Sequence, residues 1–440
     1  MSWLGAAIVI LVLALTFQLG LLAYAMYALV GVILLSRWLT SRWSGSLVAE
    51  RTLNRMEADT GDTVAILSTV RNTSQLPVPW ALLEDLLPLH ALVHNPPSLK
   101  LSGRRVMLTS IGGGRTKSIM YQMKCNRRGY YQIGPLVLET GDLFGLHRQY
   151  RVLTKPTFLT VLPEVIPLTG YDIASRRPLG EVRMTHRLYE DPTRNAGVRE
   201  YEPGDPLNRV HWGATARTGK LHSKIYEPST VAGATILLDL HEDSNPKRDE
   251  PIRSEIAIAA TNSLCHYLYD MGQQVGVITN GRDGADRIRE EGWDYDLRTR
   301  DAARNSVAML TESDRLRPQV HAPARGPEHL RRLQLALARV ELTNGIHFDQ
   351  LVSETACRLP KDASVIAILQ EVPETYAVAL GNLRRQGYAV SAILNVYDAY
   401  EFAERSKHLL AEGVSTHHLM DKAAIATIAK QEFFGVGAAG

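Results

Sequence analysis

The start of the chain has almost no polar side chains. Between Trp3 and Ser36 no side chain is charged, and Gln18 is strongly polar. A helix needs about 20 residues to cross the roughly 30 Å core of a bilayer. The run is too long for one relaxed span, and polar and flexible residues meet at 18–20. The sequence therefore predicts a transmembrane helical hairpin within residues 1–43, with residues 3–38 in contact with the lipid bilayer.

Lys and Arg are absent before the apolar run, which argues against a cleavable signal peptide with its basic start. Basic residues follow the run instead, at Arg37, Arg42, Arg51 and Arg55. Positive charge beside a span favours the cytoplasmic side, and a hairpin brings Trp3 to the same interface as Trp38 and Trp43. We therefore expect the inner (cytoplasmic) membrane, with the soluble domains facing the cytoplasm. The alternative is one long tilted helix with the large region outside.

Cysteine and net charge are also scarce. Cys125, Cys265 and Cys357 are widely spaced and odd in number, so no disulfide framework is indicated. The net charge is +3, and no basic stripe with interleaved aromatic residues occurs. These features argue against nucleic acid as a partner.

Residues 46–165 have the pattern of a β-sandwich domain. Short alternating segments are separated by turn residues, which is typical of a sandwich of immunoglobulin-like size. Pro77 and Pro79 are expected to interrupt this pattern before Trp80. The segment 112–115 is rich in glycine but lacks the Gly-Lys-Ser/Thr ending of a phosphate loop, so we interpret it as a hairpin loop.

Residues 231–440 alternate between strand and helix patterns. Strands are expected at 234–239, 274–279, 364–369, 388–395 and 415–418, and helices at 251–271, 328–342, 348–359, 374–385, 399–411 and 422–433. Such alternation predicts a doubly wound parallel sheet, which binds ligands outside the carboxyl ends of its strands. The stretch 281–327 has a weak pattern and is interpreted as an insertion or a long surface loop.

The segment between these domains, residues 166–230, has the most distinctive composition of the chain. Pro203 and Gly204 form a predicted turn, and Asp205 is the expected N-cap of a helix that runs to about Arg217. Gly219 is expected to end the helix in the left-handed conformation. A strand at 221–226 follows.

This segment resembles the signature of the bacterial family called domain of unknown function 58 (DUF 58). Its matching residues are Arg199, Glu200, Tyr201, Gly204, Asp205, Arg209, His211, Trp212, Thr215 and Arg217. Two upstream stretches, 126–135 and 142–146, also resemble family motifs. The resemblance implies a von Willebrand factor A-like α/β domain and a partnership with AAA+ ATPases of the MoxR class.

Two interpretations of the signature residues remain open. In the first, the charged residues form a salt-bridge network that locks the segment against the α/β domain, and Trp212 belongs to the core. In the second, Arg209, Arg217 and Lys220 face a phosphate group or an acidic peptide. His211 and Thr215 are one helical turn apart, but threonine is a poor unaided nucleophile, so no catalytic residue is assigned.

The resemblance also implies a magnesium site, because von Willebrand factor A domains often bind Mg²⁺ through Asp-x-Ser-x-Ser after the first strand. Asp239 is present here, but His241 and Asp243 replace the two serines. Asp239 and Asp243 are therefore the candidate metal ligands, and Mg²⁺ is the candidate cofactor.

These observations favour a membrane-anchored scaffold or adaptor that works with a MoxR-type ATPase. The alternative function is a metal-dependent enzyme that uses the carboxylates at the end of the first α/β strand. The interpretation as an adaptor is preferred because no nucleophile and base are indicated together.

Overall fold

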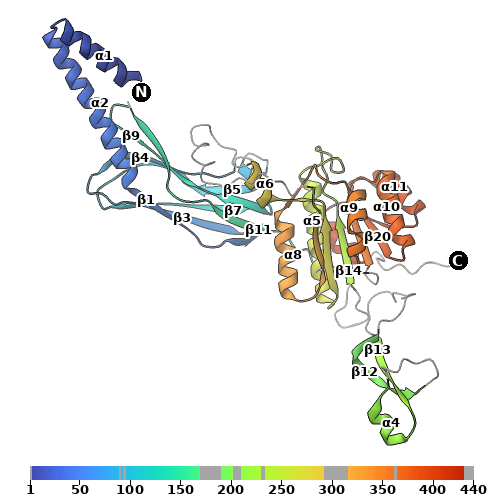
Figure 1. Ribbon diagram of the computed structural model, residues 1–440. Coiled ribbons are helices and arrows are strands. Elements are labelled where there is room, and N and C mark those ends of the chain that lie inside the picture. Colours follow the sequence, from blue (N-terminus) through green and yellow to red (C-terminus); the bar gives the residue numbers. More distant parts are fainter. Residues whose placement is uncertain are drawn as a thin grey trace. The chain divides into compact units, whose positions relative to one another are not determined.

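A computed structural model describes residues 2–88, 91–92, 96–145, 147–168, 190–201, 210–228, 233–291, 316–360 and 364–430 (Figure 1). The chain divides into two compact units. The first contains residues 1–164, 282–314 and 334–341, and the second contains residues 165–281, 315–333 and 342–440.

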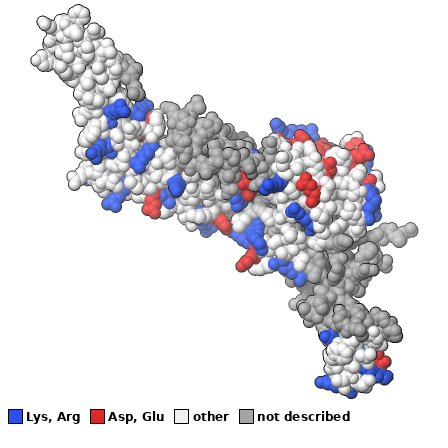
Figure 2. Space-filling view, viewed as in Figure 1, with Lys and Arg blue, Asp and Glu red and all other residues white. Residues whose placement is uncertain are grey.

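Two helices, α1 (Ser2–Thr16) and α2 (Gly20–Ser46), begin the first unit. Gln18 lies between them with a φ of 54°, a left-handed conformation that breaks the helix at the predicted place. By length and composition α2 is able to cross a membrane, and α1 is a shorter apolar helix. Figure 2 shows no charge on this face of the projecting part of the two helices, with Lys and Arg where α2 joins the rest of the unit. The transmembrane hairpin stays a prediction.

The strands of the first unit follow directly from α2. They are β1 (Leu47–Leu53), β2 (Glu57–Asp59), β3 (Thr63–Asn72), β4 (Val78–Asp85), β5 (Leu99–Gly103), β6 (Val106–Ile111), β7 (Thr116–Cys125), β8 (Gly129–Ile133), β9 (Leu136–Gly141), β10 (Arg148–Val152) and β11 (Thr157–Leu162). Among the described residues they form sheets in the orders β1-β3-β7-β5, β10-β9-β4-β6 and β2-β11-β8. A β-rich region at 46–165 is thus consistent with the sequence.

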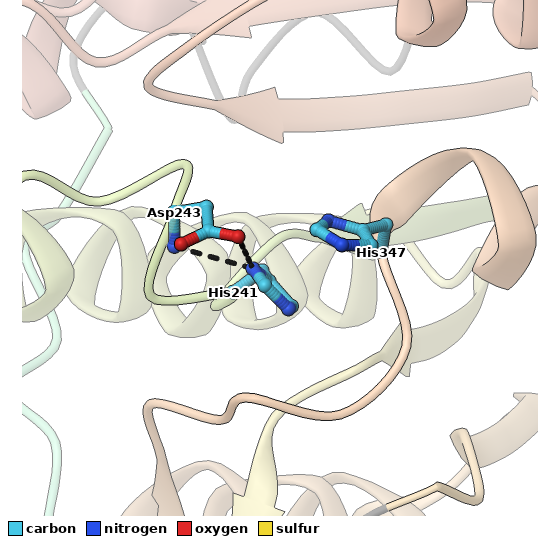
Figure 3. A group of neighbouring side chains, drawn as sticks. All are labelled: His241, Asp243 and His347. Carbon is cyan, nitrogen blue, oxygen red and sulfur yellow. Dashed lines mark hydrogen bonds and ion pairs between the residues drawn. The ribbon is translucent and has the colours of Figure 1, made fainter.

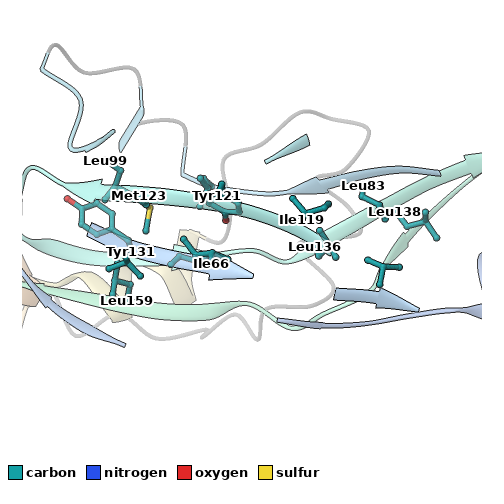
Figure 4. Packing of buried hydrophobic residues seen from close by; sticks show 14 of the residues in the cluster. Ile66, Leu83, Leu99, Ile119, Tyr121, Met123, Tyr131, Leu136, Leu138 and Leu159 are labelled. Atoms are coloured by element: carbon teal, nitrogen blue, oxygen red, sulfur yellow. The ribbon is translucent and has the colours of Figure 1, made fainter. Parts of the chain in front are cut away.

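The core of this unit follows from the alternation in its strands. Buried and exposed residues alternate along β7, so that Ile119, Tyr121 and Met123 point inward. Figure 4 shows them packed with Ile66 and Leu138 from other strands. Full burial of each such side chain contributes about 1.5–3 kcal/mol.

Two expectations for this region were wrong. Pro79 and Trp80 lie inside β4, where the pairing with β6 shifts between Val78 and Ala81. A proline is tolerated at such an irregularity because no regular ladder bond is lost. The glycine-rich segment 112–115 joins β6 to β7, which belong to different sheets, so it is a connection between sheets and not a hairpin.

The second unit contains one mixed sheet. In the described part of the chain it has the order β17-β15-β14-β19-β20-β21. The strands are β14 (Gly233–Leu238), β15 (Gln274–Thr279), β17 (Gln319–Ala324), β19 (Ser364–Leu369), β20 (Ala389–Leu394) and β21 (Ser415–His418). Neighbouring strands are parallel except for β17, an antiparallel edge strand that the sequence did not indicate. In chain order this is the 3-2-1-4-5-6 arrangement of doubly wound folds.

Helices cover the sheet. They include α5 (Ile252–Asp270), α8 (Pro327–Arg339), α9 (Phe348–Thr355), α10 (Glu374–Arg385) and α11 (Ala399–Ala411). Every residue of β14 is buried, as expected for a parallel strand covered on both faces. Phe348, Leu380 and Leu409 from three helices join one apolar cluster with Leu394 of β20. The helix expected at 422–433 is a 3₁₀ helix at Ala423–Lys430, and residues 431–433 lie outside the described residues.

Two short elements from the stretch 281–327 lie in the first unit. They are β16 (Arg282–Asp283) and α6 (Gly284–Glu291), and β16 pairs with β18 (Val340–Glu341). Residues 292–315 of this stretch lie outside the described residues.

The signature segment forms a small antiparallel pair, β12 (Glu190–Glu200) with β13 (His222–Pro228), and the helix α4 (Trp212–Thr218). A helix that runs unbroken from Asp205 is wrong, because Val210 forms a β-bridge with Ser223 and His211 is the N-cap of α4. Asp205 itself lies outside the described residues. A residue paired as strand cannot also be helical. The expected end is confirmed, since Gly219 has a φ of 73°.

Candidate functional site

Polar side chains gather at the carboxyl edge of the sheet in the second unit. The loop that contains Asp239, His241 and Asp243 follows β14, Asn280 follows β15, and Glu371 follows β19. The chain leaves the adjacent strands β14 and β19 at the point where the strand order reverses. Doubly wound sheets form a binding crevice at this switch point.

Asp239 organises the loop after β14. Its side chain is buried, and Oδ1 accepts hydrogen bonds from the backbone N of His241 at 3.1 Å and from Nδ2 of Asn280 at 2.7 Å. Asn280 Oδ1 in turn accepts from the backbone N of Leu240 at 2.8 Å. Burial raises the pKa of Asp239, and hydrogen bonds from Asn280 and Ser244 oppose this effect. Asp239 therefore fixes the path of the loop.

His241 and Asp243 of this loop form a compact cluster with His347, which precedes α9 (Figure 3). One potential ligand atom from each residue lies within 4.8 Å of the others. His241 Nδ1 accepts a hydrogen bond from the backbone N of Asp243 at 3.2 Å and lies 3.7 Å from Asp243 Oδ2. The rings of His241 and His347 have centroids 3.9 Å apart. The side chain of His241 is 5% exposed, whereas that of Asp243 is 79% exposed.

A cleft of about 540 Å³ adjoins the cluster and is lined in part by Asp243, His347, Asp349, Glu371 and Tyr376. The Tyr376 hydroxyl lies 3.0 Å from Ser244 Oγ and accepts from the backbone N of Phe348 at 3.3 Å.

Structural partners hold the titratable groups of this cleft. Burial raises the pKa of Tyr376 to about 12. Burial also raises the pKa of Glu371, and the Arg405 guanidinium, 2.7 Å from that carboxylate, opposes the effect. Tyr376 and Glu371 are therefore held in place by their partners.

The cluster does not fit the expected hydroxyl-rich magnesium site. The two positions where serines would supply oxygen ligands carry His241 and Asp243. Mg²⁺ prefers oxygen ligands, whereas imidazole suits Zn²⁺, Cu²⁺, Ni²⁺ and iron. Asp243 belongs to the cluster and Asp239 lies next to it in the loop, so their assignment as ligands stays a prediction. His347 was missed because only the fold brings it to this loop.

The described signature residues mainly serve their own small element. His211 Nδ1 caps α4 by accepting from the backbone N of Ala214 at 2.9 Å. Thr215 Oγ1 accepts from the backbone N of His222 at 3.1 Å, and Glu200 pairs with Lys220 at 3.1 Å.

The signature as a binding site stays a prediction. Trp212 is 70% exposed, so its interpretation as a core residue is wrong. Arg199, Tyr201 and Arg217 lie within the described segment, whereas Gly204, Asp205 and Arg209 lie outside the described residues.

The upstream motif contains a structural residue whose role the sequence did not indicate. Arg128 is buried, and its Nη1 donates to the carbonyl oxygens of Leu337 at 2.8 Å, Ala338 at 3.3 Å and Val340 at 2.8 Å. Leu337 and Ala338 lie at the carboxyl end of α8, where carbonyl groups lack helical partners, and Val340 directly follows the helix. Arg128 thus ties residues 337–340 to the motif.

The chain is therefore an α/β protein with a switch-point cleft, joined to a β-rich unit that carries an apolar helix. Residues 197–294 match the family described as protein of unknown function DUF58. The uncharacterized protein YeaD of Bacillus subtilis (strain 168) is 24% identical over 240 residues, which are 54% of this chain and 57% of YeaD. The chain thus spans little more than half of that relative. Both matches support the DUF58 family.

Solved structures show only weak similarity. The CARDB domain of PF1109 from Pyrococcus furiosus is 12% identical, with 26% of this chain and 94% of that chain covered and a TM-score of 0.18. Proximal thread matrix protein 1 from the mussel byssus is 10% identical, with 46% and 45% covered and a TM-score of 0.27. Scores at this level support no conclusion about fold or function.

Proposed function

We propose that this protein is a membrane-anchored adaptor whose α/β domain is von Willebrand factor A-like and binds a partner protein at the switch-point cleft. The observation that carries the proposal is the cleft itself, which lies where doubly wound sheets bind ligands and is lined by Asp243, Asp349 and Glu371. The acidic lining favours a basic surface on the partner. The partner class is a MoxR-type AAA+ ATPase, which the family resemblance implies.

The membrane part of the proposal rests on α1 and α2. Large apolar side chains on α2 are exposed, with Leu21 91% and Leu35 55% exposed. Burying such surface in lipid is favourable by roughly 25 cal/mol per Å². Arg37 and Arg42 follow the apolar run and favour a cytoplasmic position for the rest of the chain.

Protease treatment of intact spheroplasts tests this orientation. We expect the soluble domains to be protected until the membrane is permeabilised. Cleavage of these domains in intact spheroplasts contradicts the cytoplasmic orientation and supports the single tilted span.

Binding is favoured over catalysis because structural partners hold the polar groups of the cleft. Tyr376 is hydrogen-bonded at its hydroxyl, and Glu371 is paired with Arg405. A metal-dependent reaction near Asp239 is the second candidate, and the cluster of His241, Asp243 and His347 favours a metal there without specifying a reaction.

Crosslinking in native membranes, followed by purification of the full chain, tests the partner. We expect an AAA+ ATPase of the MoxR class to be recovered with the wild-type protein. Asp349→Lys should reduce recovery about tenfold, because it places positive charge in the cleft without altering the histidine–aspartate cluster. Glu404→Lys on α11 is the matched control and should retain the partner. Equal recovery with both variants, or recovery of no AAA+ protein, contradicts the proposal.

A further inference from the structure

We propose that His241, Asp243 and His347 bind a divalent transition-metal ion of the Zn²⁺ type, and that this site does not select Mg²⁺. The inference concerns the protein alone and does not depend on the adaptor function. It follows from the replacement of the expected hydroxyl ligands by imidazole and carboxylate groups.

The distances suit a metal with short bonds. Zn²⁺ lies about 2.0–2.2 Å from histidine nitrogen and carboxylate oxygen atoms, so two ligand atoms of a tetrahedral ion are roughly 3.3–3.6 Å apart. His241 Nδ1 and Asp243 Oδ2 are 3.7 Å apart, and the ligand atoms of all three residues lie within 4.8 Å of one another. Because the Asp243 side chain is 79% exposed, a small rotation can complete the approach.

The hydrogen bond at His241 Nδ1 also suits a metal. Its Nδ1 accepts a hydrogen bond from the backbone N of Asp243, so this nitrogen carries a lone pair. A neutral imidazole nitrogen with a lone pair is the form that coordinates metals. A bound ion would replace the backbone hydrogen bond as the partner of this lone pair.

The surroundings fix the ligands and leave one side open. Asp239 holds the backbone N of His241, and His347 directly precedes α9, where Gln350 Oε1 accepts from its backbone N at 3.4 Å. Three protein ligands leave the fourth position of a tetrahedral zinc ion free. The cleft next to Asp243 and His347 gives that position access to water or to an incoming ligand.

Titration with Co²⁺ tests the site in the full chain, purified in detergent without a histidine tag. We expect a visible absorption band that saturates at a single Co²⁺ per chain and is removed by Zn²⁺ but not by excess Mg²⁺. His347→Ala and Asp243→Ala should each weaken binding by at least about tenfold. His408→Ala, which removes an exposed histidine on α11, should leave the titration unchanged.

The controls make the result decisive. Unchanged melting temperatures of the metal-free variants show that they remain folded. Absence of a saturable band in the wild-type protein overturns the proposal. So does equal binding by His347→Ala and wild type, or competition by Mg²⁺ as effective as that by Zn²⁺.

The turn between β9 and β10 carries two exposed apolar side chains, and we infer that this turn makes a second contact with the bilayer. Leu143 and Phe144 in this turn are 72% and 70% exposed. Asp142, at the start of the turn, accepts a hydrogen bond from Ser36 Oγ of α2 at 2.5 Å, and both residues are buried. Figure 1 shows β9 beside α2.

This contact places the turn at a defined level of α2. Ser36 ends the uncharged run, and Arg37 follows it, so Ser36 marks the expected boundary between lipid and water. Asp142 is also held by the backbone N of His147 at 3.0 Å and by Trp80 Nε1, which donates to its carbonyl oxygen at 3.3 Å. These hydrogen bonds hold Asp142, and the two apolar side chains that directly follow it lie beside the boundary. The inference rests on the proposed membrane anchoring.

A fluorescent probe on a single cysteine tests the contact in full-length protein reconstituted into liposomes. Cys357→Ser removes the exposed native thiol, and Phe144→Cys carries the probe. We expect brominated lipids to quench this probe several-fold more than a probe at Met56→Cys, an exposed position in the same unit. Flotation of the liposomes reports anchoring separately. If the protein floats and both probes are quenched equally, the proposed contact of the turn with the bilayer is overturned. If the protein does not float, the proposed membrane anchoring itself is overturned.

Discussion

Each unit of the molecule buries an aspartate, and the two carboxylates are partnered differently. In the β-rich unit, Asp85 binds Arg51 through paired contacts and accepts from Tyr121 at 2.9 Å. In the α/β unit, Asp239 binds neutral donors, the backbone N of His241 and Nδ2 of Asn280. Burial raises the pKa of both, but only Asp85 has a guanidinium in contact to oppose the effect.

The difference separates a closed structural site from an open candidate site. Arg51 and Asp85 have side chains 1% and 0% exposed, so their pair is sealed in the core. Asp239 is equally hidden, but the loop that it holds leads to the exposed carboxylate of Asp243. A buried carboxylate thus stabilises the fold in one unit and positions a binding cluster in the other.

The largest expected effect comes from breaking the closed site. Asp85→Ala leaves Arg51 charged and buried without its partner, and such a loss costs about 3–5 kcal/mol of unfolding free energy. Chemical unfolding of the full chain in detergent measures it. Asp62→Ala is the control, because Asp62 pairs with Arg55 at the surface and should cost less than about 1 kcal/mol. Similar losses in both variants would contradict a sealed structural role for Asp85.

Asp239→Asn should have a small effect on the unfolding free energy and a large effect on metal affinity. Asparagine keeps an oxygen that can accept from the backbone N of His241, so the unfolding free energy should fall by less than about 2 kcal/mol. The hydrogen bonds that hold the loop are weakened, and we expect about 10–100-fold weaker Co²⁺ binding by the full chain, as for other residues that orient metal ligands. Unchanged affinity would remove Asp239 from the site.

The pH dependence of stability tests the raised pKa of Asp239. Because the pKa of Asp239 is raised in the folded state above its ordinary value of 3.8, the folded state favours the protonated form. Its contribution to stability is fully present below the unfolded pKa and is lost as pH rises through the folded pKa. As pH rises, the unfolding free energy of the wild type should therefore decrease relative to that of Asp239→Asn. A difference independent of pH contradicts the raised pKa.

The smallest effects are expected in the signature segment. Lys220→Ala removes an exposed ion pair with Glu200, and Trp212→Ala removes a side chain that is 70% exposed. Each should change the unfolding free energy by less than about 1 kcal/mol. Thermal unfolding of the full chain measures both. A loss of several kcal/mol from Trp212→Ala would restore its interpretation as a core residue.

The elements that the sequence predicted best are those with a clear hydrophobic pattern. β14 and β19 are continuous apolar runs, and α10 has a regular apolar face, because each packs against elements on more than one side. Weakly patterned edge elements were missed. β17 carries Pro323, and β5 and β10 expose several of their residues, so neither composition nor alternation marks them as strands.

The sequence indicated where the candidate site lies but not all of the residues that form it. The end of the first α/β strand was identified because Asp239 ends an apolar run. His347 could not be found this way, since it joins the cluster only when the loop before α9 meets the loop after β14. In the signature segment, local pattern placed Gly219 correctly, but the pairing of Val210 with Ser223 shortened the helix.

Site-specific photocrosslinking tests most directly whether the switch-point cleft binds the partner. A photoreactive amino acid at Thr375, an exposed residue of the cleft, is compared in native membranes with one at Glu404 on α11. If the partner binds at the cleft, Thr375 crosslinks to an AAA+ ATPase and Glu404 does not. A partner captured from Glu404 but not from Thr375 would contradict binding at the cleft.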